Sequence, residues 1–344
     1  MPVSGTPAPG LPRAGLRLVR AERRTFAGSA EFLSDPGNRA AVDVYLSDLV
    51  RGFPPHLPHT STLTEDSAAP PLTMSPSQGH SYGEMAQTLI GAVTSADQPV
   101  DLLVLAFSIH DMQPGRATAT YLSHVCPGNP MSFAICDQGS VAAYSGLRIA
   151  RDYPASTERS RSLVIVVEQA ALPYDVSTAL PAQHRGVALL LENGPVADRS
   201  AEDGSAGNES AGRRAGPARL VGLTQRPDLA PAAVAGQAEA DLAELTAGHR
   251  EVRLVLSPAL AAAWPRQLGE QVRVGPGDQP STGIWWQLVD ELDALGALDA
   301  PDRVDAPDQL DASGGQAAGR PSLLVAADYD PDLRYLCMIA LELG

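Results

Sequence analysis

A cysteine lies where an apolar stretch gives way to small residues, in the segment MSFAICDQGSVAAYSGLRIA at 131–150. A thiol at a turn from strand into helix can act as a nucleophile, because backbone N–H groups and the positive end of the helix stabilise the thiolate. A cysteine that ends an apolar strand can also be a core residue, since cysteine is among the most buried residue types. Cys136 is therefore the first candidate for a catalytic group, with a core role as the alternative.

The remaining residues that could do chemistry exclude several mechanisms. The three cysteines form no CxxC pair and the seven histidines no HExxH motif, so neither a metal site nor a disulfide framework is expected. The chain contains no lysine, and all 25 basic residues are arginine, which excludes a Schiff base and a Walker lysine. No GxGxxG motif follows a strand. We therefore expect no metal and no bound cofactor.

The charge of the chain narrows the choice of partners. The formal net charge of −15 argues against nucleic acid or an anionic membrane as a partner, because both require a concentrated basic surface. The apolar runs are shorter than the roughly 18 residues that cross a bilayer. The first 15 residues are rich in proline and glycine and lack the apolar stretch of a secretory signal. These features predict a protein of the cytoplasm.

Helices and strands are expected to alternate along the chain. Short runs rich in Leu, Val and Ile predict strands, and apolar residues at helical spacing predict helices. The expected strands are DLLVLAFS, PMSFAIC, SLVIVVEQA, GVALLLEN, RLVGLTQ, EVRLVLS, SLLVAADY and LRYLCMIALEL, and the expected helices are YGEMAQTLIGAV, RATATYLSHV, residues 138–150, AAVAGQAEADLAELTAG and GIWWQLVDELDAL. This alternation is typical of a layered α/β architecture with both faces of the sheet covered.

Two segments divide this pattern. Residues 196–218 are rich in Gly, Ser and charged residues and are expected to be a linker or surface loop between an N-terminal half, 12–195, and a C-terminal half, 219–344. Residues 298–321 are acidic and rich in Pro and Gly, which predicts an exposed loop.

The order of elements around Cys136 resembles the thiolase-like condensing enzymes, especially the β-ketoacyl carrier-protein synthase III group. The stretches DLLVLAFSIHD, RATATYLSHV, MSFAIC and DQGSVAAYSGLRIA follow one another in the family's order, and Cys136 falls at the family's acyl-accepting cysteine. The resemblance extends from GLRLVRAERRTF to the C-terminal LLVAADYDPDLRYLCMIALEL. It implies two similar α/β halves in a five-layered α-β-α-β-α fold and a dimer as the expected assembly.

The sequence departs from the family at three places. Ser257 stands where the family has a histidine, and Asp278 aligns with an asparagine; near the C-terminus, DYD at 328–330 replaces a Gly-rich turn. The family's His and Asn stabilise an enolate, which an ionised Asp278 would repel. Decarboxylative condensation is therefore disfavoured, whereas acyl transfer through Cys136 is retained. His110, just beyond a predicted strand, is the candidate for the missing base.

Two functions follow from the resemblance. The first is an acyltransferase that moves an acyl group from an acyl carrier protein or CoA thioester through Cys136 to an acceptor, in polyketide, antibiotic or other secondary-metabolite biosynthesis. The second is a catalytically inactive, chain-length-factor-like partner subunit of a heterodimeric synthase. A homodimer, or a heterodimer with another ketosynthase-like chain, is expected. An acidic carrier protein would dock on arginines such as Arg148, Arg151, Arg159 and Arg161.

Overall fold

The computed structural model describes residues 15–28, 34–41, 44, 79–109, 111, 117–153, 160–171, 180–194, 218–264, 271–298 and 322–344. The predicted linker at 196–218, apart from Ala218, lies outside these residues. So does the predicted acidic loop at 298–321, apart from Leu298. His110 also lies outside them.

Ten described strands form one hydrogen-bonded order, β3-β2-β4-β5-β1-β6-β10-β9-β7-β8. The N-terminal strands are β1 (Gly15–Phe26), β2 (Leu102–Ala106), β3 (Met131–Ile135), β4 (Ser160–Glu168) and β5 (His184–Gly194). The C-terminal strands are β6 (Ala218–Arg226), β7 (Val252–Leu256), β8 (Val272–Val274), β9 (Leu323–Asp330) and β10 (Tyr335–Glu342). All eight predicted strands are present, and β1 and β8 are additional.

The two sets of five strands have the same topology. In the first set β2 runs parallel to β3 and β4, and β5 runs antiparallel to β4 and β1. In the second set β7 runs parallel to β8 and β9, and β10 runs antiparallel to β9 and β6. Two residue pairs, Arg17 with Arg219 and Leu18 with Ala218, join β1 to β6 and so connect the sets. The chain is therefore a structural duplication.

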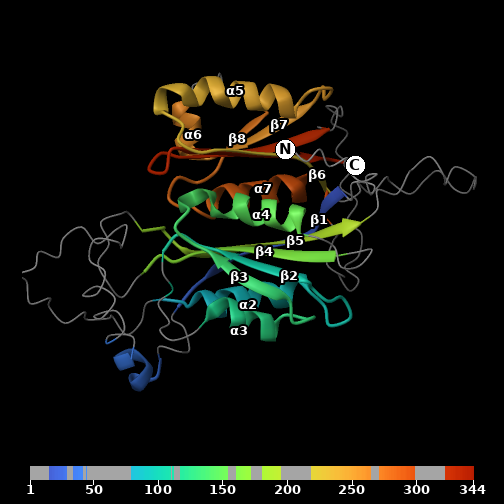
Figure 1. Ribbon diagram of the computed structural model, residues 1–344. Coiled ribbons are helices and arrows are strands. Elements are labelled where there is room, and N and C mark those ends of the chain that lie inside the picture. Colours follow the sequence, from blue (N-terminus) through green and yellow to red (C-terminus); the bar gives the residue numbers. More distant parts are fainter. Residues whose placement is uncertain are drawn as a thin grey trace, which may run out of the picture.

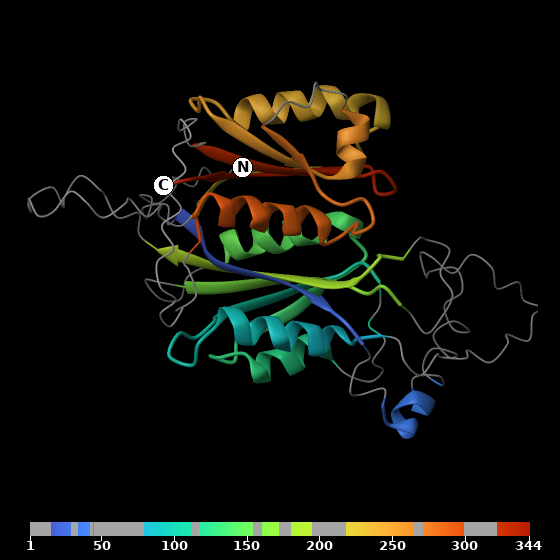
Figure 2. The same ribbon diagram turned by 180° about the vertical axis from the view of Figure 1, so that it is seen from behind.

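The helices form three layers around the two sets of strands. Six helices in the described part of the chain make up these layers: α2 (Tyr82–Val93), α3 (Thr118–Val125), α4 (Ala142–Asp152), α5 (Val234–Leu245), α6 (Pro258–Ala263) and α7 (Gly283–Ala294). Figures 1 and 2 show α2 and α3 on one outer face, α5 and α6 on the other, and α4 beside α7 in the middle. This is the predicted five-layered α-β-α-β-α arrangement. No helix in the described ranges is long and apolar enough to cross a membrane.

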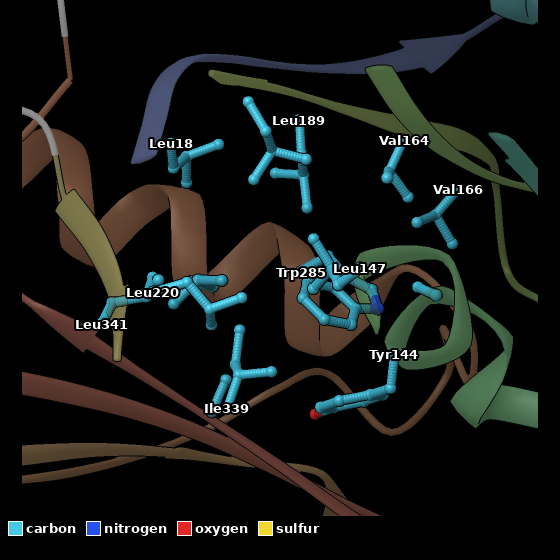
Figure 3. Close-up of a cluster of buried hydrophobic side chains, with 14 of the residues drawn as sticks. Leu18, Tyr144, Leu147, Val164, Val166, Leu189, Leu220, Trp285, Ile339 and Leu341 are labelled. Carbon is cyan, nitrogen blue, oxygen red and sulfur yellow. The ribbon is translucent and has the colours of Figure 1, made fainter. Parts of the chain in front are cut away.

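The largest hydrophobic core lies in the middle layer. The rings of Tyr144 on α4 and Trp285 on α7 pack with their centroids 4.8 Å apart, and both residues are fully buried. Figure 3 shows side chains of both halves, among them Leu189 and Ile339, converging on Trp285. Apolar contacts of the middle helices with both sets of strands therefore hold the two halves together. Burial of apolar surface of this kind contributes about 25 cal/mol per Å² to stability.

Replacing Trp285 by alanine is expected to destabilise the protein by about 3–5 kcal/mol, because it leaves a large cavity between the two sets of strands. The change is measured as the midpoint of urea unfolding. Its neighbour Trp286 is only partly buried and has the guanidinium of Arg185 4.5 Å from its ring centroid. Trp286→Ala is the control and should cost clearly less; equal losses would contradict the assignment of the middle-layer core.

Candidate active site

A cavity of about 870 Å³ lies at the carboxyl ends of strands β2, β4, β7 and β9. Residues of both halves line it. In the first half, Ser108 lies just after β2 and Glu168 is the last residue of β4. In the second half, Ser257 directly follows β7 and Asp328 lies in β9. Ends of parallel strands are the usual place for ligands in α/β proteins, because backbone groups and helix N-termini converge there. The duplicated halves therefore meet at one candidate site.

Asp328 is the most buried carboxyl group of this cavity, with 1 % of its surface exposed. Burial raises its pKa from 3.8 to about 6, and the neighbouring hydroxyls of Ser257 and Ser140 oppose that rise. Its Oδ2 atom is buried without a hydrogen-bond partner among the described residues. A carboxyl group with a pKa near neutrality and such an oxygen is suited to accept a proton from a bound ligand.

Ser257, which the resemblance aligned with the family's histidine, is the N-cap of α6. Its hydroxyl oxygen accepts from the backbone N–H of Leu260 and from that of Tyr329, each at 3.3 Å. With both acceptor positions used, its single proton is available for Asp328. The structure therefore brings the predicted residue Ser257 into the cavity, where it supports a carboxylate.

Ser140 lines the same cavity at the start of α4. It lies in the single turn of 3₁₀-helix, Gly139–Val141, that leads into this helix. Its backbone N–H donates to Oδ2 of Asp330 at 3.0 Å, while Oδ1 of Asp330 accepts from the N–H groups of Asp332 and Leu333. Gly139 has φ +51°, and a Cβ atom there would lie 1.9 Å from Oδ2 of Asp330. Glycine is favoured at this turn, because it adopts the positive φ without strain and leaves room for the carboxylate of Asp330.

Glu168 holds the start of α7 in the corresponding way. Its Oε2 accepts from the N–H of Ser281 at 2.9 Å and its Oε1 from the hydroxyl of Thr282. Burial raises its pKa from 4.5 to about 7 against these hydrogen bonds. Ser108 connects both turns, because it donates to the carbonyl oxygen of Gly139 at 3.0 Å and its Oγ lies 2.8 Å from that of Ser281.

Cys136 lies directly after β3 and is half-buried, but it is not among the residues that line the cavity. Its thiol donates to Oδ2 of Asp137 at 3.6 Å. Partial burial and the charge of Asp137 raise the pKa of the thiol. This is opposite to the lowering expected at a helix start, because Cys136 lies several residues before the first turn of α4. Its role as the acyl-accepting group stays a prediction.

The other two predicted residues do not join this cluster. Asp278 is exposed and does not line the cavity; its backbone carbonyl accepts from the N–H of Ala182 at 2.9 Å. His110 cannot be placed because it is outside the described residues. Their roles stay predictions.

Sequence reasoning did not select Asp328, Asp330 and Glu168, although a signal was present. The strands SLVIVVE and SLLVAAD are similar to each other, and each ends in an acidic residue. An acidic residue at the end of a fully apolar strand must be buried or lie at a site, since charged groups are rarely buried unpaired.

The described lining residues carry five carboxyl groups and no Arg or His. These groups are Asp137, Glu168, Asp328, Asp330 and Asp332. No three His, Cys, Asp or Glu side chains in the described ranges are placed to hold a metal ion. The arrangement can accept protons and bind hydrogen-bond donors, and it would repel an anionic substrate.

Asp328→Asn is expected to stabilise the protein at about pH 8 and to have little effect at about pH 4. The pKa of Asp328 is raised from 3.8 to about 6 in the folded state. Ionisation therefore opposes folding as the pH rises between these values, by about 3 kcal/mol once complete. Chemical unfolding at both pH values measures the difference, with Asp332→Asn at the exposed rim as the control. The same change in stability at both pH values would contradict the shift.

Comparisons with known proteins identify the fold. No protein-family model matches the sequence, and no curated protein matches it either. Among solved structures, the acyltransferase ChlB3 superposes with a TM-score of 0.54 at 14% identity over 95% of this chain and 97% of that one.

Two further solved structures cover almost the whole chain. A single-residue variant of OleA from Xanthomonas campestris has a TM-score of 0.52 at 10% identity, covering 97% of this chain and 100% of that one. The fungal type III polyketide synthase ORAS has a TM-score of 0.51 at 12% identity, covering 95% and 99%. The chain therefore has the thiolase-like fold of the condensing enzymes, in a divergent form.

Proposed function

We propose that the chain is an acyltransferase that takes an acyl group from a carrier-protein or CoA thioester and delivers it to an acceptor bound in the cavity. The observation that supports this most is Asp328, a buried carboxyl group with a pKa near 6 next to the hydroxyl of Ser140. One of its oxygens has no partner among the described residues. A nucleophile and a base beside each other at the start of a helix are the minimum that acyl transfer needs.

Ser140 is the group that we propose receives the acyl chain. Its Oγ attacks the thioester carbonyl while Asp328 takes the hydroxyl proton; the C–O bond forms, the C–S bond breaks, and the thiolate leaves with the proton from Asp328. The acceptor then attacks the Ser140 ester, with Asp328 again as the base. Ser257 is a positioning residue in this scheme, because it holds Asp328 through its hydroxyl.

Cys136 is the alternative acyl-accepting group. It lies one residue before Asp137, which lines the cavity, so a small movement of this turn would expose the thiol to a bound thioester. Ser140 itself lines the cavity and Cys136 does not, and this position favours Ser140 as the acylated group.

Decarboxylative condensation fits the cavity less well. A malonyl group carries a carboxylate, and loss of carbon dioxide transfers its negative charge to the enolate, whereas the described lining includes the carboxyl groups of Asp328 and Glu168. Like charges in a partly desolvated site repel each other strongly. From the sequence alone, Asp278 is expected to repel the enolate. In this proposal Glu168 of β4 and Asp328 of β9 repel it instead.

Incubation with an acyl thioester such as hexanoyl-N-acetylcysteamine is expected to add one acyl group to Ser140. Intact-protein and peptide mass spectrometry locate the added mass. Ser140→Ala should abolish the adduct, while Cys136→Ala and the control Ser132→Ala, in β3 away from the cavity, should retain it. If only Cys136→Ala lost the adduct, the acylated residue would be Cys136 and not Ser140. Absence of an adduct with several acyl donors would refute the proposed reaction.

A second candidate function is an inactive partner subunit of a condensing enzyme. The observation that favours it is the hydrogen bond from Ser140 N–H to Asp330, which occupies the donor that an oxyanion would use at the start of α4. A chain that fills this donor with its own carboxylate can keep the architecture without the chemistry.

Co-production with a condensing enzyme of its own pathway separates the two candidates. The partner-subunit function predicts a stable heterodimer by native mass spectrometry, whose product formation is unchanged by Ser140→Ala. The acyltransferase function predicts that Ser140→Ala abolishes acyl transfer whether or not a heterodimer forms. Loss of activity in that variant, with the heterodimer intact, would rule out the inactive subunit.

A further inference from the structure

Two residues that line the cavity each have a buried hydrogen-bond acceptor without a partner among the described residues. Gln169, directly after β4, lines the cavity and is 1 % exposed. Its Nε2 donates to the backbone carbonyl of His80 at 2.7 Å. A carbonyl oxygen can only accept, so the amide must present its nitrogen to His80 and its Oε1 toward other groups. That Oε1 is buried and has no partner among the described residues.

Asp328 provides a second buried acceptor without a donor. Its residue is also 1 % exposed, and its Oδ2 has no partner in the described part of the chain. A buried acceptor that lacks a donor costs about 1–3 kcal/mol, and more when it is charged. Two such atoms in the lining of one cavity indicate that a ligand supplies the missing donors.

The other two buried carboxyl groups of the cavity do not need such a ligand. Both oxygens of Glu168 accept hydrogen bonds from the start of α7. Both oxygens of Asp330 accept from backbone N–H groups. Among the described lining residues, the buried acceptors that lack a hydrogen-bond donor are therefore Oδ2 of Asp328 and Oε1 of Gln169.

We propose that this cavity binds a primary amine as its ammonium form, held by Oδ2 of Asp328 and Oε1 of Gln169, and that the amine is the acyl acceptor. The second part rests on the proposed function, whereas the binding does not. An ammonium group brings three donors and a positive charge, which match two acceptors and an anionic lining without Arg or His among its described residues. A hydroxyl group brings one donor and no charge.

The reaction then yields an amide. The bound ammonium gives one proton to Asp328, and the neutral nitrogen attacks the ester carbonyl on Ser140. The C–N bond forms and the C–O bond to Ser140 breaks, while the second proton from nitrogen returns to Oγ of Ser140. Asp328 releases its proton to solvent, so the sum of both steps is thioester plus ammonium giving amide, thiol and one proton.

The binding part is tested with 1,4-diaminobutane and its neutral counterpart 1,4-butanediol, by isothermal titration of the whole chain. We expect the diamine to bind at least about tenfold more tightly than the diol, since a charge-assisted hydrogen bond contributes about 1.5–3 kcal/mol. Asp328→Asn and Gln169→Leu should each remove most of this preference. Gln271→Leu, at an exposed position, is the matched control and should leave it unchanged.

The outcomes distinguish this inference from the proposed function. Equal binding of diol and diamine by the unmodified chain overturns the inference, whatever the variants do and even if an acyl adduct forms. An equal loss of preference in Gln271→Leu and Gln169→Leu also overturns it. Diamine binding without any acyl adduct supports the amine-binding site and contradicts the proposed acyl transfer. An adduct that the diamine discharges as the amide, faster in the unmodified chain than in Gln169→Leu, supports both.

Discussion

Two carboxylates that cross between the halves of the duplicated fold determine the geometry of the site. Glu168, at the end of β4 in the first half, accepts hydrogen bonds from the start of α7 in the second half. Asp330, at the end of β9 in the second half, accepts from the start of α4 in the first. Both carboxylates bind the turns that lead into these helices, and a negative charge near a helix N-terminus is favourable because it meets the positive end of the dipole. These hydrogen bonds tie the turns before the middle helices to strands of the opposite half, and both carboxylates line the cavity.

The hydrogen bond between Ser140 and Asp330 also affects the groups that could react at this site. Because Asp330 occupies the N–H of Ser140, the dipole of α4 is compensated within the chain, and a thiolate at Cys136 gains little from it. Asp328 combines a raised pKa with an oxygen that has no partner among the described residues, and for this reason we propose it as the base. The described lining of the cavity contains the hydroxyl of Ser140 and the carboxyl group of Asp328, and not the thiol of Cys136.

Most of the architecture could be predicted from the sequence, and the composition of the site could not. Apolar runs and helical spacing located eight strands and the long helices, because burial on both sheet faces leaves a strong pattern. Strand β1 was not predicted as a strand, since its arginines interrupt the pattern, and α6 and β8 have only 6 and 3 residues. Ser257 was found through the resemblance. Asp328 was not found, because its role depends on contacts between residues far apart in the sequence.

The pH dependence of acyl-adduct formation tests the central claim, that Asp328 is the base of an acyl-transfer site between the halves. The rate on Ser140 is measured by mass spectrometry from about pH 5 to about pH 8 in the unmodified chain and in Asp328→Asn. The account predicts that the rate rises with pH and levels above a midpoint at about 6, and that the variant is slower by about two orders of magnitude without this step. A profile that is the same in both proteins would contradict it.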